Sequence, residues 1–129
     1  MRQEIALWRK QGEADLAAAR TLLEDGIHYA SVFFSQQAAE KLLKAAWILQ
    51  KRELPPKTHN LVMMARNLGA PERIIDEAAE LSPEYFLTRY PNVDVGIPEE
   101  IYTRLSAERH LKAAEAVREW TETLLVKEE

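Results

Sequence analysis

The sequence predicts an all-α protein, an up-and-down bundle of about five helices in a single domain that spans residues 1–129. Three observations support this prediction. Apolar residues recur every three or four positions along most of the chain, which is the spacing of one face of an α-helix. Residues 30–49 include neither Gly nor Pro and consist mainly of strong helix formers. No stretch shows the alternation that is typical of a β-strand.

Three of the expected helices are long. The first, residues 3–25, has an apolar face that includes Gly12, a poor helix former whose position indicates a close neighbouring backbone. The second ends near residue 52 and is apolar on most sides, so it should lie at the centre of the bundle. Its polar residues form one stripe, interpreted as a solvated face that could line a groove in a dimer: Gln36, Gln37, Glu40, Lys41 and Lys44. The third long helix is expected over residues 99–126.

The shorter helices are predicted from their start and stop signals. Thr58 is the expected N-cap of a helix that runs to residue 68, and Pro71 is the expected first residue of the next helix. Ser82 and Pro83 repeat an N-cap and N1 pattern, which predicts a bend into another short helical segment. Gly26 and Gly69 have the positions of residues that terminate helices, and residues 91–98 have the composition of a loop.

The composition excludes several classes of function. A formal net charge of −4 argues against broad, non-specific binding to nucleic acids or anionic membranes, and no DNA partner is expected. The chain has no Cys, and its three His residues lack a metal-binding spacing, so neither a metal nor another cofactor is predicted. There is no apolar run of membrane-spanning length and no signal-peptide core, which makes the cytoplasm the expected location.

Four motifs, taken in order, resemble those of a known family. They are Ala14-Asp15-Leu16 with Ala19 and Leu22-Leu23; Tyr29-Ala30 followed by Phe34-Ser35-Gln36-Gln37-Ala38-Ala39-Glu40-Lys41; Pro56-Lys57-Thr58-His59-Asn60-Leu61; and Thr88-Arg89-Tyr90-Pro91-Asn92. Each motif alone is weak. Their order over nearly the whole chain resembles the HEPN domain family.

The resemblance implies a helical bundle that usually forms a homodimer. HEPN domains are found beside minimal nucleotidyltransferases, or are encoded next to them, often as toxin–antitoxin pairs. Many relatives are metal-independent RNases whose Arg and His, four to six residues apart, are paired across the dimer. Others are associated with nucleotide binding and do not catalyse a reaction.

Arg104 and His110 match the pattern of the RNases, with five residues between them. A His can transfer the proton of a ribose 2′-hydroxyl, and an Arg can stabilise the charged phosphate of the transition state. In one unbroken helix, however, the two side chains diverge by about 120°. His110 then lies near the apolar face, whereas Arg104 lies beside Glu108 on the solvated face. Lys112 also replaces a Tyr that is adenylylated in some relatives, so a working catalytic pair is the less favoured interpretation.

Other candidate residues could bind a ligand or a second subunit. His59, with Lys57, could meet a phosphate at the start of the third helix, although capping of that helix is the simpler interpretation. Arg89 could contribute to a ligand cleft, but anchoring its own turn, for example on Asp94, is favoured. Phe33 and Trp47 flank the polar stripe and are the expected interface residues.

These observations leave three hypotheses. The favoured one is a dimeric, non-catalytic module that binds a nucleotide or RNA and partners a minimal nucleotidyltransferase. The second is a metal-independent RNase toxin that uses Arg104 and His110. The third is a structural adaptor that binds only protein.

Overall fold

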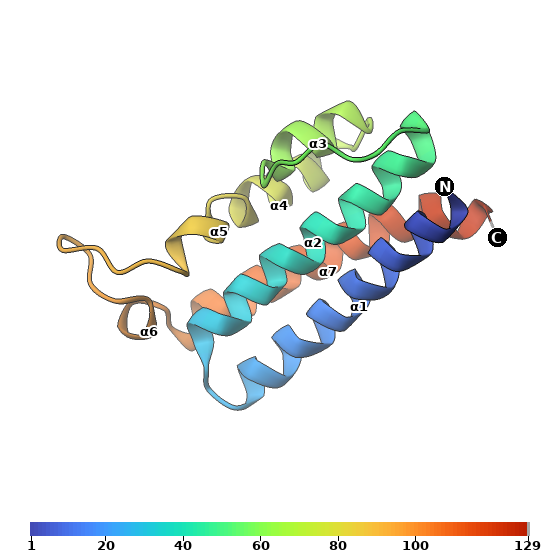
Figure 1. Cartoon of the computed structure of the whole chain (residues 1–129). Helices are drawn as coiled ribbons and strands as arrows, with labels where there is room; N and C mark the ends of the chain where they lie inside the picture. The colour runs from blue at the N-terminus through green and yellow to red at the C-terminus, as the bar shows by residue number, and fades with distance from the viewer. Residues whose placement is uncertain (129) are drawn as a thin grey trace.

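The computed structural model describes residues 1–128, and these residues form an all-α bundle without a β-strand. The helices are α1 (Arg2–Glu24), α2 (His28–Lys51), α3 (Leu61–Asn67), α4 (Glu72–Leu81), α5 (Glu84–Leu87), α6 (Pro98–Ile101) and α7 (Arg104–Leu125), followed by a 3₁₀ turn, Val126–Glu128. Figure 1 shows α1, α2 and α7 side by side, with α3 and α4 packed against α2, and α4 also against α7. The loop between α5 and α6 extends beyond one end of the bundle, and both chain termini lie at the other end. The predicted fold class is therefore confirmed.

Helix α2 lies at the centre of the bundle, as its sequence predicts. It contacts α1, α3, α4, α5, α6 and α7, and 14 of its 24 residues are buried. The interpretation of its polar stripe as a solvated face is wrong, because Gln36, Glu40 and Lys44 are 0%, 4% and 6% exposed. Residues of α1 and of the segment between α2 and α3 cover the stripe and supply polar partners. Helix α2 therefore has a buried polar face.

The structure shifts several of the predicted helix boundaries. Asn60, not Thr58, caps α3, because its side-chain oxygen accepts a hydrogen bond from the backbone N–H of Met63 at 3.0 Å. The last long helix begins at Arg104 and not at residue 99, because Thr103 adopts an extended conformation and its hydroxyl accepts a bond from the Ser106 N–H. Residues 98–101 form a separate turn of helix, α6.

Ser82 has a structural role that differs from the predicted N-cap. It ends α4, and its hydroxyl accepts a hydrogen bond from the Leu61 N–H at 3.1 Å and donates one to the His59 carbonyl at 3.3 Å. This side chain therefore joins the end of α4 to the start of α3 and fixes the backbone at His59.

Gly12 lies where α1 and α2 are in close contact. A Cβ atom at this position would be 2.8 Å from Cγ and 2.9 Å from Cδ2 of Leu42, whose side chain is fully buried. The expected close approach is present, but the neighbour is a side chain and not a backbone. Glycine is therefore required at this position by packing.

We expect Gly12→Ala to lower the free energy of unfolding by about 1 kcal/mol, because overpacking costs more than the gain in helix propensity. In a Leu42→Ala background the same change should instead stabilise the protein, because the clashing atoms are gone. Urea unfolding of the wild type, the two single variants and the double variant measures the coupling between Gly12 and Leu42. A stabilising effect of Gly12→Ala in both backgrounds would contradict the prediction.

Candidate functional site

A row of interacting polar side chains begins in the buried face of α2 and ends at the surface. The ammonium of Lys44 lies 3.3 Å from Oε2 of Glu40, and Oε1 of Glu40 lies 2.8 Å from Nδ1 of His59. The Glu40 carboxylate also accepts a hydrogen bond from the Gln36 amide at 3.3 Å. Because an ionised carboxylate only accepts hydrogen bonds, Nδ1 of His59 acts as the donor, and Nε2 is the ring nitrogen left to meet a ligand.

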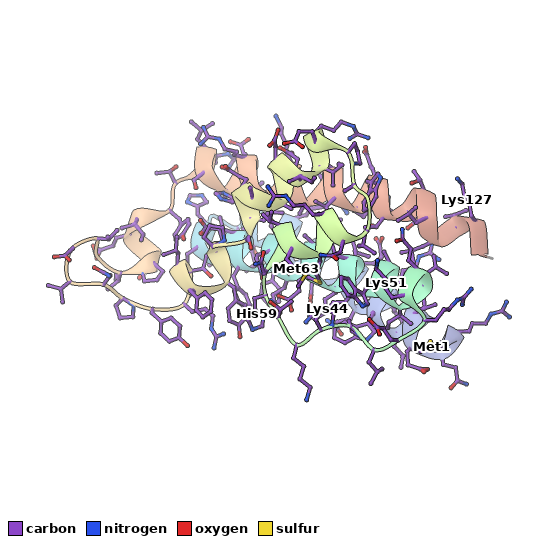
Figure 2. All side chains as sticks on the ribbon, turned by 90° about the horizontal axis from the view of Figure 1, so that it is seen from above. Met1, Lys44, Lys51, His59, Met63 and Lys127 are labelled. Atoms are coloured by element: carbon purple, nitrogen blue, oxygen red, sulfur yellow. The ribbon has the colours of Figure 1, made fainter. Side chains whose placement is uncertain are left out.

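His59 is part of a stack of side chains on the outside of the bundle. Its ring lies 3.4 Å from the Tyr85 ring, nearly parallel to it at 12°, and meets the edge of Phe86 at 6.2 Å. The Arg89 guanidinium lies over the Tyr85 ring at 4.7 Å. Figure 2 shows His59 and Lys44 beside the loop that joins α2 to α3. We call Lys57, His59, Tyr85, Phe86 and Arg89 the His59 surface.

The His59 surface offers both aromatic rings and positive charge to solvent. Lys57 and Arg89 are exposed, the Phe86 side chain is 57% exposed, and the His59 side chain is 37% exposed. Helix α5 places Tyr85 and Phe86 beside His59, in the segment that precedes α3. The Ser82 hydroxyl, at the end of α4, donates a hydrogen bond to the carbonyl of this segment at His59. Such an arrangement can stack on a planar base and pair with a phosphate.

The predicted pair Arg104 and His110 is not brought together within the chain. His110 is 6% exposed, and its Nδ1 donates to the Ser106 carbonyl at 2.7 Å, while its Nε2 lies 3.6 Å from Oε1 of Glu84. The Arg104 side chain is 63% exposed and lies 3.8 Å from Glu108, the neighbour expected from the spacing. The two candidate residues therefore have different partners and different environments.

Glu84 forms a second buried polar cluster with His110 and Tyr102. The Tyr102 hydroxyl donates to Oε2 of Glu84, which is 7% exposed. Burial, together with the hydrogen bond and negative charge of Glu84, raises the pKa of Tyr102 above its ordinary value. Because Glu84 belongs to α5 and Tyr102 immediately follows α6, the cluster joins the two helices that flank the long surface loop.

Several predicted side-chain roles require adjustment. Arg89 lies over the rings of Tyr85 and Tyr90 and does not pair with Asp94, whose backbone N–H bonds to Asn92. Phe33 packs against Phe34 and Tyr85, so its ring is half-buried within one chain.

Trp47, the other expected interface residue, is also half-buried. Its indole N–H donates to Glu53, and the Lys51 ammonium lies over its ring. Part of each of the two predicted interface rings, Phe33 and Trp47, therefore remains exposed.

Sequence reasoning missed Tyr85 and Phe86 as ligand candidates and Glu40 as the partner of His59. The signal in the sequence is the pair of aromatic residues directly after Ser82-Pro83-Glu84, which by itself predicts only a short helical segment. No group of His, Asp or Glu residues that could hold a metal ion is present in the part of the chain that the structure describes. Within the same residues, every helix is too short or too polar to cross a membrane.

Comparisons with known proteins agree with this architecture. The HEPN domain model matches residues 5–124. "Putative toxin MJ1304" of Methanocaldococcus jannaschii is 33% identical over 127 residues, covering 88% of this chain and 82% of that protein.

Solved structures with the same fold include TT1696 from Thermus thermophilus, with a TM-score of 0.83 and 29% identity over 92% of this chain and 96% of that one. Another is ST0689, described as an archaeal HEPN homologue, with a TM-score of 0.80 and 32% identity over 92% of this chain and 95% of that one. The family match covers almost the entire chain, and the helices follow the same path. The protein therefore belongs to the HEPN domain family.

Proposed function

We propose that this HEPN domain binds a nucleotide or single-stranded RNA on the His59 surface and does not itself cleave RNA. The observation that carries the proposal is the stack of Arg89, Tyr85 and His59, with His59 held from behind by the buried Glu40. Aromatic rings beside cations are the usual means of holding single-stranded nucleic acid without strong sequence preference. The net charge of −4 limits such binding to a local surface.

The environment of Arg104 and His110 favours binding over catalysis. A general base needs a ring nitrogen within reach of the ribose hydroxyl, but His110 is buried and its two nitrogens face Ser106 and Glu84. Arg104 is directed to Glu108 on the surface. In this proposal His110 is structural, and loss of an RNase activity in His110→Ala with the fold retained would support the catalytic alternative instead.

In the same proposal the domain acts as a homodimer in a toxin–antitoxin-like pair with a minimal nucleotidyltransferase. The name of the M. jannaschii relative, "Putative toxin MJ1304", supports a toxin-like role. The exposed parts of Phe33 and Trp47 are the proposed contacts between subunits. Sedimentation equilibrium should show a dimer at micromolar concentration, and Trp47→Glu should weaken it; a monomer would contradict this part of the proposal.

The binding site is tested with fluorescently labelled single-stranded RNA and with AMP. We expect Phe86→Ala to weaken RNA binding about five-fold or more, because a base–aromatic stack contributes about 1–3 kcal/mol. Leu87→Ala is the matched control: Leu87 is similarly exposed at 53% on the same helix, but lies outside the ring contacts around His59. Fluorescence anisotropy measures both affinities.

Salt dependence tests the contribution of the cations. Removing Arg89 or Lys57 should reduce the slope of log Kd against log salt by about 0.7 for each phosphate contact that is lost. Arg73→Ala, an exposed cation on α4, should leave the slope unchanged. Equal effects of Phe86→Ala and Leu87→Ala, or of Arg89→Ala and Arg73→Ala, would refute binding at the His59 surface.

A further inference from the structure

A pocket of about 900 Å³ lies at the end of the bundle opposite the loop between α5 and α6. It is formed by the first turns of α1 together with the last residues of α2 and α7. In Figure 1 this is the end where the N- and C-terminal labels and the end of α2 come together. We call it the end pocket, and it does not include any residue of the His59 surface.

The apolar part of the end pocket is aliphatic. Leu49 and Leu125, which are 8% and 2% exposed, belong to a small core cluster against which Ile5 packs. Ala6 adds a methyl group from the exposed side of α1. None of the described residues that line the pocket is aromatic, although its volume is within the range of about 300–1,000 Å³ that is typical of small-molecule sites.

The charged part of the end pocket is strongly positive. Among the residues that the structure describes, four cations, Arg2, Arg9, Lys10 and Arg52, and one carboxylate, Glu13, line it in a chain whose net charge is −4. Glu13 pairs with Arg118 at 2.8 Å, and Arg9 pairs with Glu122.

The other cations of the end pocket are Arg2, Lys10 and Arg52. Among the described residues, no carboxylate forms an ion pair with Arg2, Lys10 or Arg52. Arg52 also has a left-handed backbone conformation, with φ of 57°, at the position after α2 where Gly or Asn is usual. An arginine is thus present at the pocket despite a backbone cost.

We propose that the end pocket binds an amphipathic anion, a long aliphatic chain that carries one carboxylate or phosphate. The aliphatic chain would cover Ile5, Leu49 and Leu125, and the head group would pair with Arg52, Lys10 and Arg2. Arginine side chains bind carboxylates and phosphates through paired hydrogen bonds, and these are stronger beside an apolar surface than in open water. A nucleotide fits less well, because the pocket has no ring on which its base could stack.

Isothermal titration calorimetry with dodecanoate and dodecyl phosphate, below their micellar concentrations, tests the proposal. Both anions should bind, whereas dodecyl maltoside, which has the same chain and no charge, and acetate, which has charge but no long aliphatic chain, should bind at least ten-fold more weakly. Arg52→Gly removes the cation and suits the left-handed backbone, so we expect an intact fold and about ten-fold weaker anion binding.

A pair of size-matched variants tests the location. Ala6→Phe should fill the pocket and abolish binding, whereas Ala17→Phe, at an exposed position farther along α1, should not change it. Circular dichroism establishes that each variant is folded. The proposal is overturned if dodecanoate does not bind, if dodecyl maltoside or acetate binds equally well, or if Arg52→Gly and Ala6→Phe leave the affinity unchanged.

Discussion

Glu40→Ala is expected to lower the free energy of unfolding by about 3–5 kcal/mol, because it leaves a buried ammonium without its counter-ion. Lys44 is 6% exposed, and in the native protein its charge faces the Glu40 carboxylate at 3.3 Å and the Trp8 ring at 5.4 Å. The substitution also removes the acceptor for Nδ1 of His59. Urea unfolding monitored by circular dichroism measures the loss.

Two controls separate the buried pair from an ordinary ion pair. Glu13→Ala breaks the Glu13–Arg118 pair, whose side chains are 37% and 38% exposed, and should cost at most about 1 kcal/mol. Glu40→Leu combined with Lys44→Met replaces both charges by apolar groups and should recover most of the stability. A cost below about 1 kcal/mol for Glu40→Ala would mean that water reaches Lys44, contrary to its burial in the structure.

The positions of the helices could be predicted because each depends on its own sequence. The apolar spacing along α1 and α7, the glycines after α1 and α3, and the prolines before α4 and α5 are local signals, and the helices occur where these signals place them. The predicted start of the last long helix at residue 99 is wrong because it, too, rests on local signals alone. Tyr102 continues the apolar face of α7, so the sequence does not indicate the extended conformation of Thr103, whose hydroxyl caps α7.

The burial of the polar stripe could not be predicted from α2 alone. A helical projection shows which residues share a face, but not which other segments cover that face. Asp15 from α1 pairs with Lys41 at 2.8 Å, and His59 from the segment before α3 pairs with Glu40 at 2.8 Å. These partners are 26 and 19 positions away in the sequence, so only the tertiary fold brings them together.

The candidate site was predictable only in part, for the same reason. His59, Lys57 and Arg89 belong to motifs in two separate segments, and nothing in the sequence predicts contact between these segments. The contact depends on Tyr85, whose ring lies between the two segments and touches both His59 and Arg89. The position of Tyr85 depends in turn on α5, a helix of only four residues whose packing against the segment before α3 is not visible in its own sequence.

Glu84→Ala is expected to release α5 and the loop that follows it, with a loss of about 1.5–3 kcal/mol, the range for hydrogen bonds to buried charged groups. A four-residue helix has almost no stability of its own, so α5 depends on its tertiary contacts. Glu84 provides two of these contacts, one to the Tyr102 hydroxyl and one to the His110 ring. Hydrogen exchange should therefore increase mainly over residues 84–103, and much less in α1 and α2.

Graded substitutions distinguish this local role from general destabilisation. Glu84→Gln keeps an acceptor for Tyr102 and should lose less stability than Glu84→Ala, whereas Glu100→Ala, at an exposed position of α6, should have almost no effect.

Because α5 also carries Tyr85 and Phe86, Glu84→Ala should weaken RNA binding together with the ordering of the loop, whereas Phe86→Ala should weaken binding alone. Uniformly faster exchange throughout the bundle would contradict a local anchor. A binding surface built on Tyr85 and Phe86 requires that α5 hold these two side chains in place. If exchange increased only over residues 84–103 and RNA affinity were unchanged, α5 would therefore not be part of the binding surface.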